Sequence, residues 1–76
     1  MLVRISINCL LLSEEPTAIC DRAMELLREA EIVRSFHTET TSVYFIRTTV
    51  ENEQVITITQ RLLTEQYGVG IILTAC

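Results

Sequence analysis

The sequence contains no lysine, and its ten acidic residues outnumber its six arginines, which gives a formal net charge of −4. Nucleic-acid binding relies on a basic surface that neutralises phosphates, so this charge argues against that function. The only glycines are Gly68 and Gly70, and the sequence has neither a glycine-rich phosphate loop nor a GxSxG turn for a nucleophilic serine. We therefore expect a protein that is not an enzyme.

Cysteine and histidine are too few and too scattered for a metal centre or a disulfide scaffold. Cys9, Cys20 and Cys76 form an odd set without CxxC spacing, which is typical of a reducing compartment, so we expect a cytoplasmic protein. Cys9 and Cys20 lie among apolar residues and should be buried, whereas Cys76 should be exposed. His37 is the single histidine, and we interpret it as a solvent-facing strand residue. No metal or other cofactor is expected.

No uninterrupted apolar run exceeds four residues, which excludes a membrane-spanning helix, and the polar residues near the start argue against a signal peptide. Residues 1–76 should form a single domain, since a chain of 76 residues is too short for two. Apolar residues make up 49% of the chain, which is high for this length. We expect some of that apolar surface to remain available for a partner.

The hydrophobic pattern predicts the first four elements. Residues 2–12 alternate between apolar and polar, which predicts a half-buried strand with Cys9 and Leu11 on its buried side. Ser13 is placed to cap a helix that continues to about Glu31. Residues 32–39 and 42–49 are rich in β-formers and should form a hairpin that turns at residues 40–42.

Residues 52–66 fit two patterns. The segment QVITITQ alternates and is rich in β-branched residues, as in a strand, but the apolar residues from Val55 onward also follow helical spacing. Thr48 to Glu51 resembles a capping box, Asn52 is an alternative cap, and Gly68 lies where a helix should end. We choose the helix. The last run, VGIILTAC, then predicts a strand that is buried on both faces or lies in an oligomer interface.

The resulting order, βαββαβ, predicts an α+β ferredoxin-like fold with a four-stranded antiparallel sheet and two helices on one face. The crossover rule places the first and third strands in the centre of the sheet. The face away from the helices, called here the open face, is the candidate binding surface. Its predicted residues on the two central strands are Arg4, Ser6, Asn8, Val43, Phe45 and Arg47.

Phe45, exposed between arginines, is the expected anchor for a partner. RNA-recognition modules stack bases on aromatic residues of both central strands, and the first strand here offers none.

The chain resembles a small ACT-like regulatory domain. The resemblance lies in the strand VRISI, the loop before an amphipathic helix, the strands that begin at EIVRSF and VYFIRTTV, and the helical segment ENEQVITITQRLL. It implies pairing between copies through edge strands. Such domains usually bind amino acids with the help of a glycine in the first loop, where this chain has Glu14, Glu15 and Pro16.

Two hypotheses about function follow. The first is a protein-interaction or regulatory module, such as a small inhibitor or adaptor, which binds a protein partner or a second copy as a homodimer through the open face or an edge strand. The alternative is an ACT-like domain that senses a small molecule such as an amino acid.

Overall fold

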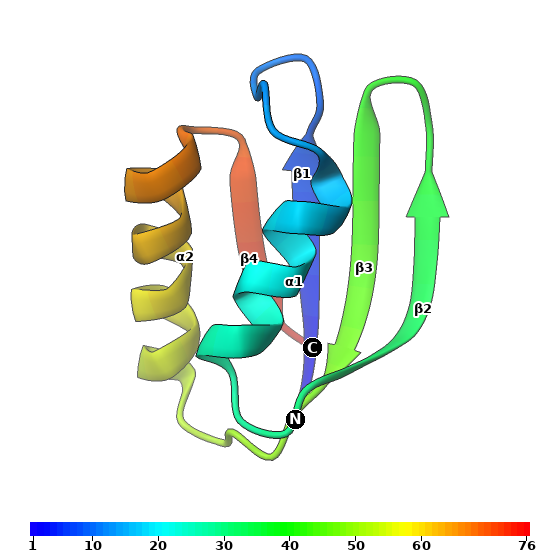
Figure 1. Ribbon diagram of the computed structural model, residues 1–76. Coiled ribbons are helices and arrows are strands. Elements are labelled where there is room, and N and C mark those ends of the chain that lie inside the picture. Colours follow the sequence, from blue (N-terminus) through cyan, green and yellow to red (C-terminus); the bar gives the residue numbers. More distant parts are fainter.

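The computed structural model describes all 76 residues. Six elements follow one another along the chain: β1 (Leu2–Asn8), α1 (Pro16–Leu26), β2 (Glu31–His37), β3 (Thr41–Arg47), α2 (Glu53–Tyr67) and β4 (Ile71–Ala75). The strands form one antiparallel sheet in the order β2-β3-β1-β4 (Figure 1). This is the predicted ferredoxin-like α+β topology, with the first and third strands in the centre.

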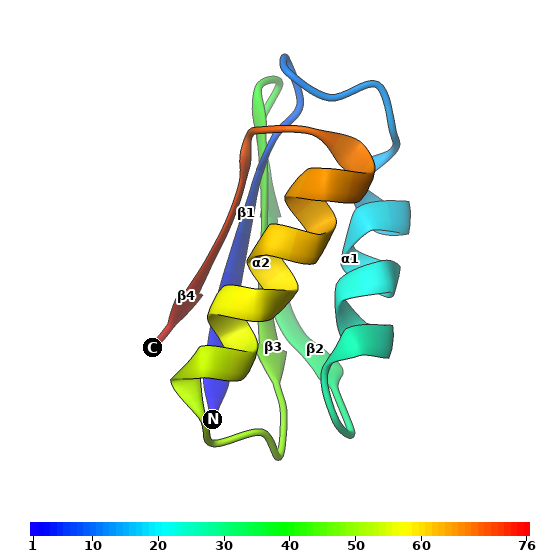
Figure 2. The same cartoon turned by 90° about the vertical axis from the view of Figure 1, so that its left-hand side faces the viewer.

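Both helices lie on the same side of the sheet, and the other side is left open (Figure 2). Helix α2 packs on β4, and α1 packs on α2 and β3. The strand β2 lies beyond both helices (Figure 1), and all seven of its residues are exposed. The sheet is therefore covered over three strands only, and one edge strand has solvent on both faces.

The core lies between the sheet and the helices. Strand β1 contributes Val3, Ile5 and Ile7, all fully buried, as its alternation predicted. The helices supply the apolar stripes that cover them, including Ile19 and Leu63. Each fully buried aliphatic side chain stabilises the fold by about 1.5–3 kcal/mol. This core fixes which face of each strand points away from the helices.

The strand β1 ends at Asn8, four residues before the predicted end. The Asn8 side-chain oxygen accepts a hydrogen bond from the Leu10 N–H at 3.0 Å, and this local turn competes with further pairing. The prediction that Leu11 belongs to the core is therefore wrong, since Leu11 is 59% exposed. Cys9, expected to be buried, is only half-buried, whereas Cys20 is buried and Cys76 exposed as predicted.

Helix α1 begins and ends inside its predicted range. Ser13 does not cap it: the residue before the helix is Glu15, with no side-chain capping bond, and Pro16 is the first helical residue. Proline disfavours helical geometry in the residue that precedes it, so Glu15 is extended and the helix starts at Pro16. The helix ends at Leu26 rather than near Glu31, because the chain reverses through Glu29, whose φ is +48°.

The ambiguous segment is helical, as chosen. The Asn52 side chain accepts a hydrogen bond from the Gln54 N–H at 2.9 Å, so Asn52 is the cap, and the capping box proposed from Thr48 to Glu51 is not formed. Gly68 ends the helix with a φ of +116°, a conformation that favours glycine. The β-branched residues are tolerated because one stripe, Ile56, Thr59 and Leu63, is buried against the sheet.

The hairpin turn comes two residues earlier than predicted, at Thr38-Glu39-Thr40. The Thr38 hydroxyl oxygen accepts hydrogen bonds from the N–H groups of Thr40 and Thr41, at 3.3 and 3.0 Å, and this turn lacks the Asn-Gly signal that would have located it. In β4, Ile71 and Leu73 are buried but Ile72 is 55% exposed. Of the two alternatives predicted for this strand, burial on both faces is therefore wrong, and a place in an oligomer interface stays a prediction.

Candidate binding surface on the open sheet face

The six predicted residues do share the open face. The antiparallel register of β1 and β3 places Arg4 opposite Phe45 and Ser6 opposite Val43. Asn8 and Arg47 lie at opposite ends of the same face. Arg47 makes an ion pair with Glu31 at 2.8 Å, and the Asn8 side-chain oxygen is used in the local turn. The middle four residues are therefore the ones free to contact a partner.

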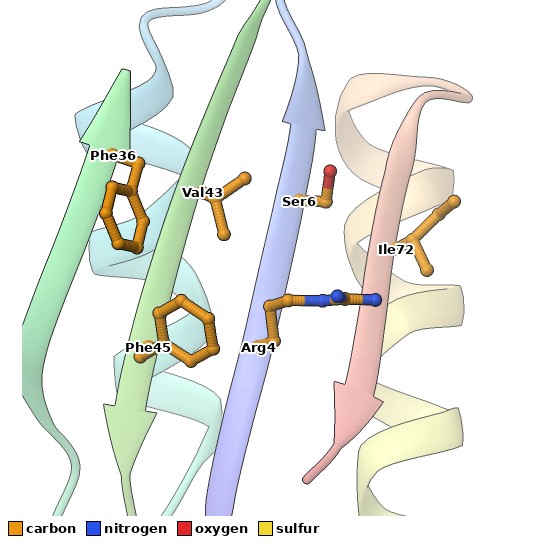
Figure 3. A pocket seen from close by; sticks show the side chains of 6 residues that line it. All are labelled: Arg4, Ser6, Phe36, Val43, Phe45 and Ile72. Atoms are coloured by element: carbon orange, nitrogen blue, oxygen red, sulfur yellow. The ribbon is translucent and has the colours of Figure 1, made fainter.

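These four residues and two others line a hollow of about 470 Å³ on the open face (Figure 3). The two that sequence analysis missed are Phe36 from β2 and Ile72 from β4. Figure 3 shows Arg4 extending from β1 towards β4, while Phe36 and Phe45 stand together on the other side of the hollow. All four strands therefore contribute to one surface that is apolar in the middle and carries an arginine.

The aromatic pair has a defined geometry. The Phe36 and Phe45 rings are 6.1 Å apart at an angle of 84°, an edge-to-face contact. The Arg34 guanidinium lies 4.6 Å from the centre of the Phe36 ring. Phe36 is 46% exposed, whereas Phe45 is half-buried behind it. Phe36 is thus the more exposed of the two rings, so the expectation that Phe45 is exposed is wrong, while its role as an anchor for a partner stays a prediction.

The open face is locally basic although the chain is acidic. Three of the six arginines, Arg4, Arg34 and Arg47, lie on it. Only Arg47 has an ion-pair partner, Glu31, so Arg4 and Arg34 present unpaired positive charge beside the apolar hollow. This combination suits a partner surface that carries acidic as well as apolar side chains.

The two edges of the sheet differ in how accessible their backbone is. On β4, the N–H of Leu73 donates a hydrogen bond to the Gln60 side-chain oxygen at 2.9 Å, so one outward backbone group of that edge is already paired. No side chain hydrogen-bonds to the backbone of β2, whose apolar Ile32, Val33 and Phe36 are 41–46% exposed. An unpaired, apolar edge of this kind is where another strand adds to a sheet.

His37 is an exposed strand residue, as predicted, and it also makes contacts of its own. It points to the helix side of β2, where its Nδ1 lies 3.0 Å from the Ser42 hydroxyl, and the Cys9 thiol lies 3.6 Å from that same hydroxyl. The His37 ring also contacts the Tyr44 ring at 5.3 Å. No carboxylate joins this group, and the contacts tie the hairpin end to the loop after β1.

Two buried groups on the helix side are held in their neutral forms. Burial raises the pKa of the Cys20 thiol from 9.0 to about 12, with a smaller contribution from Asp21. Burial also raises the pKa of Tyr44, whose hydroxyl has no hydrogen-bond partner. Neither group faces the open surface, so both belong to the interior and not to the candidate site.

Side chains that ligate metals do not cluster in this structure: no three His, Cys, Asp or Glu residues come together. Neither helix has the length and apolar character that crossing a membrane requires. Comparisons with known protein families, curated proteins and solved structures gave no match.

Proposed function

We propose that this chain is a protein-interaction module that is not an enzyme and that acts as a regulator, inhibitor or adaptor by binding a protein along its open face and the adjoining edge of β2. The observation that carries this proposal is the position of Phe36. Its exposed ring lines the open-face hollow and at the same time belongs to the unpaired edge strand. A partner strand laid along β2 would therefore gain backbone hydrogen bonds and an aromatic contact together.

The charge distribution supports a partner with acidic groups. Arg4 and Arg34 flank the apolar hollow without an ion-pair partner of their own. Arginine and aromatic side chains are the residue types that dominate binding energy at protein interfaces. Carboxylates on the partner would pair with these arginines at the rim and set the orientation of the complex.

Affinity capture with matched variants tests the proposal. The bait is the tagged full chain, used in nuclease-treated cell extract so that nucleic acid cannot bridge it to other proteins. Phe36→Glu places a charge in the hollow, and Ile58→Glu places the same charge on α2, where Ile58 is 45% exposed. We expect captured proteins other than the chain itself to be lost with Phe36→Glu and kept with Ile58→Glu. Equal capture by both variants would contradict the proposal, provided that circular dichroism shows both to be folded.

Small-molecule sensing is a second candidate, and the size of the hollow favours it. A volume of about 470 Å³ lies within the usual range of small-ligand sites. An ACT-like sensor should melt at a higher temperature in the presence of its amino acid, because a ligand at 100 times its Kd stabilises the folded state by about 2.7 kcal/mol. A melting temperature that stays constant across a panel of amino acids and metabolites would exclude this candidate.

A further inference from the structure

The most exposed apolar side chains of the molecule gather at one end of the sheet. Among the large apolar residues, Leu10, Val69 and Leu11 are the most exposed, at 73%, 67% and 59%. All three lie in loops: the two leucines follow β1, and Val69 precedes β4. Figure 2 shows this end, where the β1–α1 loop projects beyond the sheet, above the loop between α2 and β4. Exposed apolar side chains grouped in this way indicate an interaction site.

The loops hold these side chains in defined positions. The Leu11 N–H donates to the Asn8 carbonyl oxygen at 3.2 Å, and the Asn8 N–H donates to the Gly70 carbonyl oxygen at 2.8 Å. Gly70 has a φ of +103°, and a Cβ there would lie 3.3 Å from the Leu11 side chain, so glycine lets the two loops pack closely. The Cys9 N–H donates to the Thr40 carbonyl oxygen at 2.8 Å, which ties the same loop to the hairpin turn. The leucines are therefore held in place before binding, which lowers the entropy cost of a complex.

The loops at this end carry only negative charge. They are called here the loop end and consist of residues 9–15, 38–40 and 68–70. Their only charged residues are Glu14, Glu15 and Glu39, which account for −3 of the net charge of −4. All three glutamates are exposed, and none makes an ion pair. Arg22, the only arginine of α1, is already paired with Glu25. The loop end thus combines apolar side chains with free carboxylates, whereas the open face combines them with arginines.

We propose that the loop end is a second docking surface, which binds a basic amphipathic helix of a partner protein. The apolar stripe of that helix packs on Leu10, Leu11 and Val69, as such helices do on exposed apolar surfaces. Lysines or arginines that flank the stripe pair with the glutamates and orient the helix. This inference goes beyond the proposed function, because two surfaces of opposite charge give the chain two different partners, as an adaptor requires.

The composition of the loop end favours a helix over other occupants. Its apolar residues lie in loops and not in an edge strand, so a partner strand has no ladder to extend there. A second copy docked through the same surface would bring the same unpaired glutamates against one another. Anionic lipid attracts basic segments, and the loop end contains no basic residue. A basic amphipathic helix matches both the apolar side chains and the negative charge.

A defined peptide tests the proposal by fluorescence anisotropy with the full chain. The probe is a labelled leucine–lysine peptide with all its leucines on one helical face, and its control has the same composition in an order without an apolar face. We expect only the first peptide to bind, and added salt to weaken its binding. The triple variant Glu14→Gln, Glu15→Gln, Glu39→Gln should lose most of this salt dependence. No binding of the first peptide, or equal binding of the two, would overturn the proposal.

Matched variants locate the peptide on the surface. Leu10→Gln with Leu11→Gln should weaken binding at least tenfold, because both apolar anchors of the β1–α1 loop are lost. Ile58→Gln with Leu62→Gln removes the same number of exposed apolar side chains from α2 and should leave the affinity unchanged. Circular dichroism checks that both double variants are folded. An equal loss of affinity in the two would place the peptide elsewhere and refute the inference.

Further outcomes separate this inference from the proposed function and from other occupants. Phe36→Glu should leave peptide binding unchanged; a loss would place the peptide on the open face and overturn the loop end as its site. Phosphatidylcholine vesicles that bind the wild type but not the Leu10→Gln, Leu11→Gln variant would identify a lipid surface as the occupant. A wild-type dimer that the same variant breaks would identify a second copy, and either result overturns the helix. Affinity capture that Phe36→Glu does not change refutes the proposed function and leaves this inference in place.

Discussion

Replacing Phe36 with alanine should cost less folding stability than replacing a core phenylalanine, because the ring lies on the open face and is only partly buried. Complete burial of a phenylalanine is worth about 1.5–3 kcal/mol, and a ring that is 46% exposed has realised about half of this. The edge-to-face contact with Phe45 adds about 0.5–1.5 kcal/mol. We therefore expect the free energy of unfolding to fall by about 2 kcal/mol, well below the 3–5 kcal/mol of a core phenylalanine.

Urea unfolding followed by circular dichroism measures this loss, at a protein concentration low enough for the wild type to be monomeric. The m value, which is the slope of the free energy of unfolding against urea concentration, should stay unchanged, because the variant exposes nearly the same surface area on unfolding. A loss of about 4 kcal/mol or more would show that the ring belongs to the core. No measurable loss would show that the contact with Phe45 is not formed in solution.

Three further predictions concern parts of the fold that shape or surround the surface. Asn52→Ala removes the cap of α2 and should cost about 1 kcal/mol of stability in urea unfolding, and Asn52→Asp should restore most of it. Gln60→Ala removes the acceptor of the partly buried hydrogen bond from the Leu73 N–H and should cost about 1 kcal/mol of stability in urea unfolding, whereas Gln60→Glu, which keeps an acceptor, should cost less. Burial raises the pKa of Cys20 from 9.0 to about 12 in the folded state. The neutral thiol therefore contributes its full share to the free energy of unfolding below pH 9, and this share is lost as the pH rises towards 12. Stability should therefore decline over that range by up to about 1.4 kcal/mol per pH unit from this group, and Cys20→Ala should flatten the decline in unfolding experiments while Cys76→Ala leaves it in place.

The sequence carried enough information for the topology because its strongest patterns are also its core. The alternation of Val3, Ile5 and Ile7 determined the buried face of β1, and the arginines on β1 and β3 identified the open face. The helical stripe of residues 52–66 outweighed the β-branched composition, since burial of one face decides the structure of such a segment. Four of the six residues lining the hollow followed from these patterns.

The missed features depend on interactions that span the sheet. Phe36 reaches the open face only because a bulge near Ile32 resets the register of β2, and the turn at Thr38-Glu39-Thr40 carried no sequence signal to fix that register. Local hydrogen bonds explain the other errors: the turn at Asn8 ended β1 early and left Leu11 in solvent. The two edges differ in backbone hydrogen bonding because the Leu73 N–H donates to the Gln60 side chain. No local sequence pattern indicates that contact.

Amide hydrogen exchange at the β2 edge tests the central claim most directly. Isotope-labelled protein would be observed by nuclear magnetic resonance, first dilute and alone, then at high concentration and with captured partner. The outward N–H groups of Ser35 and His37 should exchange rapidly in the dilute chain and become protected in a complex, while Leu73, already bonded to Gln60, stays protected throughout. Ser35 and His37 amides that stay fast in every complex would contradict the account, because binding would then bypass the edge of β2.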